Sequence, residues 1–130
     1  MTPRWTPISL GADIPAPIGA YSAAIRAGDF VYVSGQVPRD PKTGATIGAT
    51  VEEQTRAVVR NLETVLSAAG ATLSDVVSVT VHLADAALWG AFNTTYRQLM
   101  PQPFPTRTAV GASLRGFLVE ITAVAYVGSR

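Results

Sequence analysis

The chain has 130 residues, which is enough for one domain spanning residues 1–130 and leaves no room for a second. Ten Lys and Arg residues against nine Asp and Glu give a net charge of +1, so the strongly basic face that nucleic-acid binding requires is not indicated. There are no cysteines, which excludes disulfides and cysteine metal sites, and the single histidine, His82, cannot form a His-rich metal site by itself.

The apolar composition indicates a protein that buries surface between subunits. Hydrophobic residues make up 48% of the chain and charged residues 15%, whereas about a quarter is usual for charged residues. A monomer with so few charges would leave apolar surface in water, so we expect subunit contacts. The chain shows no signal-peptide pattern and no stretch near the ~18 apolar residues of a membrane span. We therefore expect a cytoplasmic protein with no membrane partner.

The first elements that the sequence predicts are an extended lead-in and a β-hairpin. Residues 1–17 contain four of the nine prolines, which favours extended backbone. Residues 23–27 and 30–34 are two strand-like segments that flank Gly28 and Asp29. A two-residue turn with glycine first is typical of a type II′ hairpin.

A helix is predicted after the polar loop of residues 39–48. It begins at a capping box, in which Thr50 caps the first amides and Glu53 reaches back. Gly70 is placed to end it in a left-handed conformation. Its apolar face follows helical spacing and consists of Val51, Thr55, Val58, Val59, Leu62, Val65, Leu66 and Ala69.

The second half predicts a strand, a helix and two final strands. Residues 76–83 are dense in β-branched side chains, and Asp85 is a candidate cap for a helix that Pro101 stops. The face of this helix carries Leu88, Phe92, Tyr96 and Leu99. Strands follow at about residues 106–112 and 118–127. The order ββαβαββ predicts one α+β domain with two helices on one face of a sheet.

The last strand predicts two different environments for its two faces. One face carries Val119, Ile121, Ala123, Ala125 and Val127, which should pack under the helices. The other face carries Leu118, Glu120, Thr122, Val124 and Tyr126. Water tolerates this second face poorly, so we expect it to lie against another subunit. Glu120 then lies near an interface.

Arg107 and Glu120 are the candidate chemical residues. Arg107 opens an apolar strand with no acid beside it, and a guanidinium at a pocket mouth can bind a carboxylate through two parallel hydrogen bonds. The alternative is an arginine bound to a backbone carbonyl or a remote acid. Glu120 interrupts an apolar strand and could act as a general base or hold a water molecule. Its alternative is a salt bridge at the subunit interface.

Other polar and aromatic residues have structural interpretations by default. His82 alternates with apolar neighbours, so we expect a structural histidine whose hydrogen bonds are satisfied. Tyr21 and Ser34 flank the hairpin, and Gly35 could offer a backbone amide where a side chain would clash. Core or interface positions are expected for Trp5, Trp89, Phe92 and Tyr96. The sequence contains no glycine-rich phosphate loop, nucleophile elbow or metal-ligand spacing.

Short motifs distributed over residues 14–127 resemble those of one known family. They are residues 17–21 (PIGAY), 33–38 (VSGQVP), 40–44 (DPKTG), 54–70 with its Asn61-Leu62 pair, 75–77 (DVV), 92–96 (FNTTY), 105–108 (PTRT) and 119–121 (VEI). Their order resembles that of the Rid family, the reactive intermediate deaminases of the YjgF type.

This resemblance implies a fold, an assembly and a reaction. The fold is a chorismate-mutase-like (YjgF-like) α+β domain, assembled as a homotrimer with three sites in the clefts between subunits. The reaction is hydrolysis of reactive 2-imino acids or their enamine tautomers, such as 2-aminoacrylate or 2-iminobutyrate, to 2-oxo acids and ammonia. Pyridoxal-phosphate enzymes release such intermediates. Hydrolysis of this kind needs no metal or organic cofactor.

The resemblance also implies roles for individual residues. Arg107 matches the arginine that binds the substrate carboxylate, and Glu120 matches the acid that positions the attacking water. Ala109 lies where many members carry a cysteine whose backbone carbonyl contacts substrate or water. The positions that line the substrate site are matched by Tyr21, Ser34, Gly35 and Asn93.

The chain departs from the family pattern at three places. Ala20 replaces a common proline, and Thr122 replaces a second glutamate on the final strand. The stretch between Arg107 and Glu120 is about two residues shorter and carries SLRG at residues 113–116 without the usual Leu-Pro. The shortened turn bears on substrate range more than on reaction type and indicates a divergent subgroup.

Three other functions stay open at the level of sequence. The first is an endoribonuclease or translation inhibitor, against which the near-neutral charge argues. The second is a non-catalytic trimer that binds a small ligand in the same cleft. The third is a deaminase for another intermediate, such as an aminoacrylate-type product of ring breakdown. Arg107 and Glu120 together favour an enzyme but do not choose among substrates.

Overall fold

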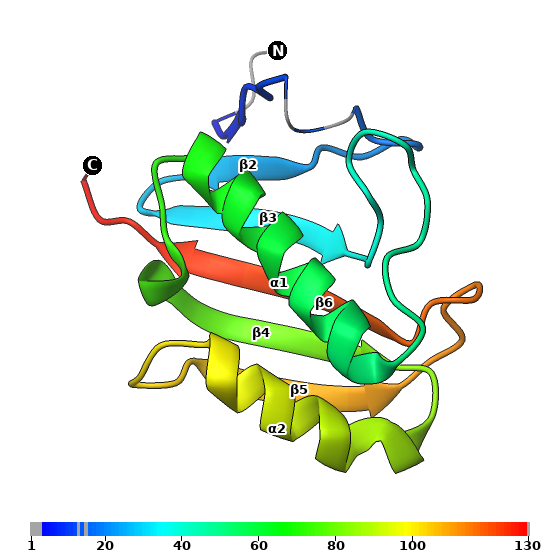
Figure 1. Cartoon of the computed structure of the whole chain (residues 1–130). Coiled ribbons are helices and arrows are strands. Elements are labelled where there is room, and N and C mark those ends of the chain that lie inside the picture. The colour runs from blue at the N-terminus through cyan, green and yellow to red at the C-terminus, as the bar shows by residue number, and fades with distance from the viewer. Residues whose placement is uncertain (1–3, 13, 15, 130) are drawn as a thin grey trace.

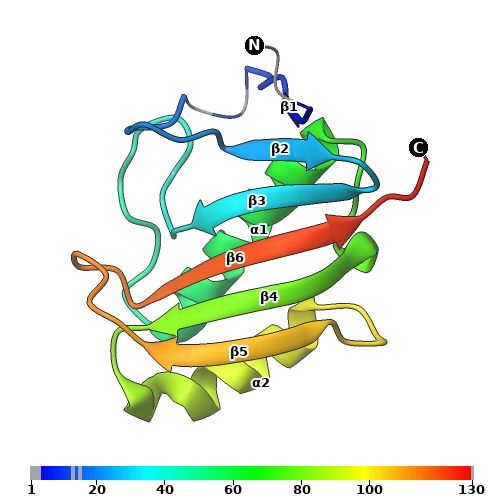
Figure 2. The same cartoon turned by 180° about the vertical axis from the view of Figure 1, so that it is seen from behind.

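Two helices cover one face of a mixed six-stranded sheet in the computed structural model, which describes residues 4–12, 14 and 16–129 (Figures 1 and 2). The strands are Thr6–Pro7 (β1), Ala24–Ala27 (β2), Phe30–Gln36 (β3), Val76–Leu83 (β4), Thr106–Gly111 (β5) and Val119–Tyr126 (β6). Their order is β1-β2-β3-β6-β4-β5, and only β4 and β5 pair in parallel. The predicted α+β arrangement with two helices on one face is confirmed.

The helices are Val51–Ala68 (α1) and Trp89–Leu99 (α2), each with a short 3-10 turn nearby, Leu73–Asp75 and Ala86–Leu88. Both helices lie behind the sheet in the view of Figure 2, so the opposite face carries no helix of the described residues. We call these the helix-bearing face and the helix-free face. No helix in the described part of the chain is long and apolar enough to cross a membrane.

The predicted hairpin is confirmed, with β2 beginning one residue later and β3 ending two residues later than expected. Gly28 has φ 59°, and Asp29 does not share the positive φ, as a type II′ turn requires. β3 extends to Gln36, beyond the predicted residue 34, because Gln36 pairs with Ile121 after an irregularity in register. Part of the predicted lead-in forms β1 against β2, where a proline is tolerated because the strand lies at the sheet edge. Residues 1–3, 13 and 15 of the lead-in lie outside the described residues.

The capping box that begins α1 is confirmed. Thr50 Oγ1 accepts a hydrogen bond from the Glu53 amide at 3.2 Å, and Glu53 Oε1 accepts from the amides of Ala49 at 3.1 Å and Thr50 at 3.2 Å. These backbone donors lower the pKa of Glu53 from its usual value. The helix ends just before Gly70, which has φ 75° as expected.

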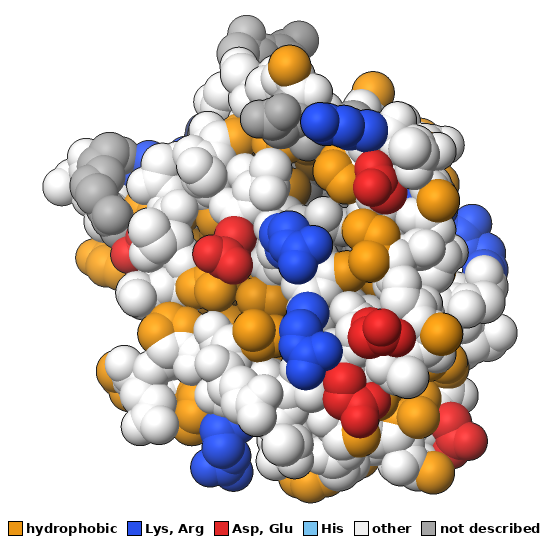
Figure 3. All heavy atoms as spheres, viewed as in Figure 1, with side chains coloured by type: hydrophobic (Ala, Val, Ile, Leu, Met, Phe, Trp, Pro, Cys, Tyr) orange, Lys and Arg blue, Asp and Glu red, His pale blue; other side chains and the backbone are white. Residues whose placement is uncertain are grey.

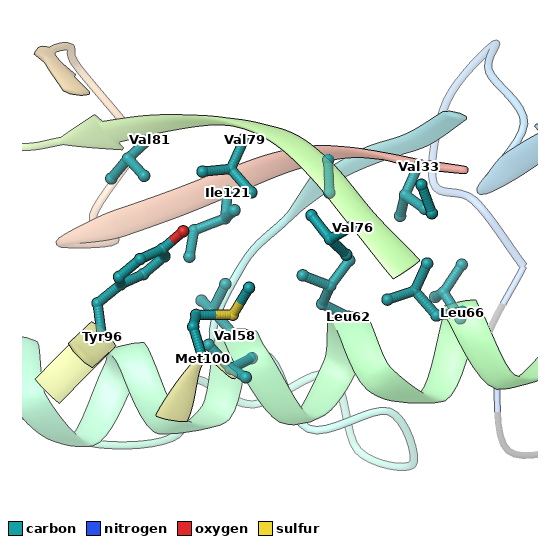
Figure 4. Close-up of a cluster of buried hydrophobic side chains, with 14 of the residues drawn as sticks. Val33, Val58, Leu62, Leu66, Val76, Val79, Val81, Tyr96, Met100 and Ile121 are labelled. Carbon is teal, nitrogen blue, oxygen red and sulfur yellow. The ribbon is translucent and has the colours of Figure 1, made fainter. Parts of the chain in front are cut away.

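The core lies between the helices and the sheet (Figure 4). Val58, Leu62 and Leu66 of α1 face the strand residues that Figure 4 labels, and α2 contributes Tyr96 with the neighbouring Met100. The predicted inner face of β6 is confirmed, because its residues are at most 3% exposed: Val119, Ile121, Ala123, Ala125 and Val127.

The helix-free face leaves apolar side chains in solvent in the single chain. Tyr32 and Phe30 alternate with the buried Val31 and Val33 along β3, so they project from this face. The Phe30 ring meets the Tyr126 ring of β6 edge-on, with centroids 5.4 Å apart. This face is the surface for which the sequence predicts a subunit partner, and that partner stays a prediction.

Candidate functional site

Arg107 is held on the helix-bearing face by residues of α2. Its Nη1 donates a hydrogen bond to Asn93 Oδ1 at 2.8 Å. Its guanidinium carbon lies 5.0 Å from the ring centroid of Tyr96, 5.7 Å from that of Trp89 and 5.9 Å from that of Phe92. These four α2 residues share one face of the helix because their spacing is i, i+3, i+4 and i+7. α2 therefore orients a planar cation at the edge strand of the sheet.

No carboxylate lies within ion-pair distance of Arg107 in the described part of the chain. The Arg107 guanidinium bonds to the side-chain amide oxygen of Asn93 and not to the backbone carbonyl or remote acid that the structural alternative expected. A pocket of about 260 Å³ adjoins it, lined by Asn93, Tyr96, Arg97, Phe104, Pro105 and Arg107. A half-buried guanidinium with donors left over at a pocket can bind an anion.

Tyr96 contacts Arg107 with its ring and directs its hydroxyl into the core (Figure 4). Its ring is nearly fully buried, and its hydroxyl has no hydrogen-bond partner among the described residues. Burial raises the pKa of the Tyr96 phenol, and the charge of Arg107 partly offsets this effect. The hydroxyl therefore stays protonated and can donate a hydrogen bond.

Glu120 lies on the other side of the sheet. It stands between the core residues Val119 and Ile121, so its side chain projects from the helix-free face. Its cross-strand partner on β4 is His82, whose Nδ1 is 3.9 Å from Glu120 Oε2. A Cβ placed on Gly35 of β3 would lie 2.9 Å from Glu120 Cδ and 3.0 Å from Oε1. The carboxylate thus occupies the space that the missing side chain of residue 35 leaves.

The expectation that His82 is a satisfied structural histidine is wrong for one ring nitrogen. Nδ1 is buried and has no hydrogen-bond partner among the described residues. The sequence pattern suggested a satisfied histidine because His82 alternates with apolar residues. The pairing of His82 with Glu120 depends on the register of β4 and β6, which cannot be read from the residue pattern of one strand.

Tyr21, Ser34 and Gly35 lie where the segment before β2 meets β3. Ser34 Oγ donates to the Ser22 carbonyl at 2.6 Å, which ties the two segments together. Tyr21 is half exposed and, with Gly35, lines a second pocket of about 380 Å³ beside α1. Within this pocket Asn61 Nδ2 donates to the carbonyls of Val37 at 3.0 Å and Arg39 at 2.8 Å. Asn61 thereby anchors the loop that follows β3.

The predicted site residues form two groups that a single chain does not bring together. Arg107, Asn93 and Ala109 belong to the helix-bearing face at β5 and α2, where Ala109 packs partly against the core. Glu120 and Gly35 meet on the helix-free face, close to the segment that holds Tyr21 and Ser34. Sequence reasoning did not assign a site role to Trp89 or His82. For Trp89 the available signal was its helical spacing, since it lies four residues before Asn93 on the same face of α2.

The described residues contain no group of three or more His, Asp and Glu side chains that could hold a metal ion. The chemistry available at the two groups is therefore that of a guanidinium, a carboxylate, an imidazole and a buried phenol. A guanidinium suits recognition of a carboxylate, and a carboxylate suits activation of water.

Comparison with known proteins shows relatives over nearly the whole chain. The profile of the family described as Endoribonuclease L-PSP matches residues 11–127. A RutC family protein of Pyrococcus horikoshii is 43% identical over 114 residues, covering 86% of this chain and 90% of that protein. The 2-iminobutanoate/2-iminopropanoate deaminase of Mus musculus is 40% identical over 116 residues, covering 88% of this chain and 86% of the relative.

A solved structure supports the same conclusion. The crystal structure of E. coli TdcF with bound serine matches at a TM-score of 0.83 and 30% identity, covering 92% of this chain and 97% of that one. The expected YjgF-like fold is confirmed by this likeness and by the arrangement of helices and strands. The family profile and the sequence relatives together show that the chain belongs to the Endoribonuclease L-PSP family, the family of the RutC and Rid (YjgF-type) proteins.

Proposed function

We propose that this protein hydrolyses reactive 2-imino acids and their enamine tautomers to 2-oxo acids and ammonia. The observation that carries the proposal is the environment of Arg107. The guanidinium is held by Asn93, surrounded by three aromatic rings, and has no carboxylate partner in the described part of the chain. A relative at 40% identity is named as a deaminase of this class, and a solved relative holds serine, an amino acid with the same carboxylate group.

Arg107 binds the substrate carboxylate in this proposal. The Asn93 oxygen accepts from one of the five N–H donors of Arg107, so a parallel pair of donors remains for the two carboxylate oxygens. The rings of Tyr96 and Trp89 lie close enough to the guanidinium to stabilise its positive charge. Orientation of this kind lowers the entropic cost of reaching the transition state.

Glu120 activates the attacking water. Its carboxylate takes a proton while the water oxygen bonds to the electrophilic imine carbon, and the C=N double bond becomes a C–N single bond. That proton passes to the nitrogen, and the proton of the new hydroxyl follows by way of Glu120, so that the C–N bond breaks, ammonia leaves and the carbonyl forms. Imines are reactive toward water, so positioning and one carboxylate suffice for acceleration.

The proposed site needs two copies of the chain. Arg107 and Glu120 lie on opposite faces of one sheet, so the Glu120 that serves a given Arg107 belongs to a neighbouring copy. The exposed apolar residues of the helix-free face, such as Tyr32 and Tyr126, favour such contact. We propose a homotrimer with three equivalent sites between subunits. At each site one subunit supplies the group with Arg107 and the adjacent subunit supplies the group with Glu120. Sedimentation at micromolar concentration tests the assembly, and a monomer would contradict it.

A coupled assay tests the function. A threonine or serine dehydratase generates 2-iminobutyrate or 2-aminoacrylate, and the release of the 2-oxo acid is followed with and without this protein. We expect faster release with the wild-type chain and with Arg60→Lys, which changes an exposed arginine on α1 that lines neither pocket. No acceleration with either imine would overturn the proposal and leave a non-catalytic binding trimer as the better interpretation.

The description of the family raises RNA cleavage as a second candidate. Figure 3 shows acidic and basic side chains interleaved on the helix-bearing face, and the net charge is only +1. Phosphate contacts dominate nucleic-acid affinity, so binding to RNA should be weak and lost at moderate salt. RNA cleavage that survives physiological salt would favour this candidate instead.

A further inference from the structure

We infer that His82 is a positioning residue for Glu120. The His82 Nδ1–H donates to Glu120 Oε2 and so fixes the carboxylate that activates the attacking water. This inference rests on the proposed function for its kinetic consequence, but the contact itself does not depend on any activity. The structure provides three observations for it: the pairing of the two residues, the buried ring nitrogen and the opening at Gly35.

His82 and Glu120 are directly opposed in the antiparallel pair of β4 and β6. Side chains at opposed positions on one face of such a pair are close neighbours. Nδ1 and Oε2 are 3.9 Å apart, and both side chains are about one third exposed, at 30% and 31%. A hydrogen bond requires the two atoms to approach to about 3.2 Å or less.

The buried Nδ1 requires a partner. It has no hydrogen bond among the described residues, and an unsatisfied buried polar atom is costly. The neighbours of His82 on the helix-free face include Thr80 on β4, Val110 on β5 and Thr122 beside Glu120 on β6. Glu120 is the one ionisable group among these neighbours, so it is the charged acceptor available to the ring.

The two oxygens of Glu120 then have different tasks. Oε2 faces His82, whereas Oε1 lies on the side of Gly35, where the absence of a Cβ leaves space for it. A hydrogen bond from Nδ1 fixes Oε2 and leaves Oε1 to hold water. The carboxylate is thus located by β4 on one side and by the backbone of β3 on the other.

The tautomer of His82 tests the contact directly. His82 is the single histidine of the chain, so its imidazole ¹⁵N resonances need no assignment by mutation. We expect the neutral ring of the wild-type protein to carry its proton on Nδ1, and Glu120→Ala to shift the proton to Nε2. A wild-type ring protonated on Nε2, or a tautomer that does not respond to Glu120→Ala, would overturn the inference.

Kinetics test the consequence. His82→Leu removes the donor, whereas His82→Asn keeps an N–H group near the position of Nδ1. We expect His82→Leu to lower kcat by roughly tenfold with little change in KM, because the carboxylate is misplaced while substrate binding at Arg107 is kept. His82→Asn should retain kcat within about threefold, and His82→Leu should have no further effect in a Glu120→Gln background.

The outcomes separate this inference from the proposed function. A wild-type protein that hydrolyses imines and a His82→Leu variant with unchanged kcat would overturn the positioning role alone. A wild-type protein without imine hydrolysis would overturn the proposed function, and the tautomer measurement would still decide whether His82 holds Glu120. Because that measurement uses the wild-type chain and Glu120→Ala, it stands even if His82→Leu does not fold.

Discussion

Arg107 and Glu120 project from opposite faces of the same sheet. Arg107 reaches Asn93 of α2 on the helix-bearing face, and Glu120 projects from the helix-free face toward the space beside Gly35. The sheet separates the two charged groups within one chain. A site that uses both must therefore draw them from two copies, which makes assembly a condition of the proposed catalysis.

Mixed oligomers should recover activity from two inactive variants. Arg107→Lys and Glu120→Ala are each expected to lose most activity, but a hybrid site can combine a wild-type Arg107 with a wild-type Glu120 from its neighbour. Random mixing of equal amounts by co-refolding should restore roughly a quarter of the wild-type rate, since each intact residue is present with a probability of about one half. No recovery in oligomers shown to contain both chains would place the two residues in different reactions.

Arg107→Lys should keep the fold and lose catalysis. Lysine keeps the charge but lacks the planar fork that binds both carboxylate oxygens and the Asn93 oxygen together. We expect kcat/KM to fall on the order of a hundredfold, which corresponds to the loss of a charge-assisted contact. Thermal unfolding should change little, and Arg60→Lys is the control. Equal activity of Arg107→Lys and wild type would show that the proposed carboxylate site is wrong.

Asn93→Ala should weaken substrate binding through Arg107. The change removes the oxygen that accepts from Arg107 Nη1 at 2.8 Å and leaves the guanidinium without its fixed orientation. We expect KM to rise by about tenfold, the equivalent of one hydrogen bond. Thr94→Ala is a matched control, because Thr94 is an exposed neighbour on α2 whose hydroxyl donates to the Gly90 carbonyl of the same helix. An unchanged KM for Asn93→Ala would remove Asn93 from the site.

Gly35→Ala should reduce activity more than stability. The new Cβ would meet the end of the Glu120 side chain at 2.9 Å from Cδ, and a flexible side chain can move away. Displacement of the carboxylate should lower kcat by at least about tenfold, with a small effect on the unfolding temperature. Gly111→Ala is the control on β5, because its nearest neighbour is the Leu83 carbonyl at 3.9 Å. A fully active Gly35→Ala would show that the position of Glu120 does not matter for the reaction.

Gly48→Ala should destabilise the chain at the start of α1. Gly48 has φ 91°, and its Cβ would lie 2.6 Å from Glu53 Cβ, the side chain that completes the capping box. Gly44→Ala has a similar positive φ of 77° but meets nothing within 4 Å. We expect Gly48→Ala to lower the free energy of unfolding by about 1–3 kcal/mol more than Gly44→Ala does. Urea unfolding at one fixed protein concentration measures the difference, and equal losses would contradict the clash.

Local chemistry in the sequence determined most of the elements. The Thr50 and Glu53 capping box, the glycine at position 28 and the alternation along β6 each act within a few residues, so their outcomes follow from neighbouring side chains and backbone geometry. The resemblance of short motifs also identified Arg107 and Glu120 as a pair. The alternation along β6 placed Glu120 on the face away from the helices, whereas the face of Arg107 was left undetermined.

Tertiary structure decided what those residues touch. The pairing of His82 with Glu120 depends on the register between β4 and β6, and the bond from Arg107 to Asn93 depends on how α2 packs on β5. β1 and the extension of β3 to Gln36 likewise exist because other strands offer hydrogen-bond partners. Such contacts join segments far apart in the chain, so the free energy that selects them comes from packing and strand pairing. No short stretch of sequence contains that information.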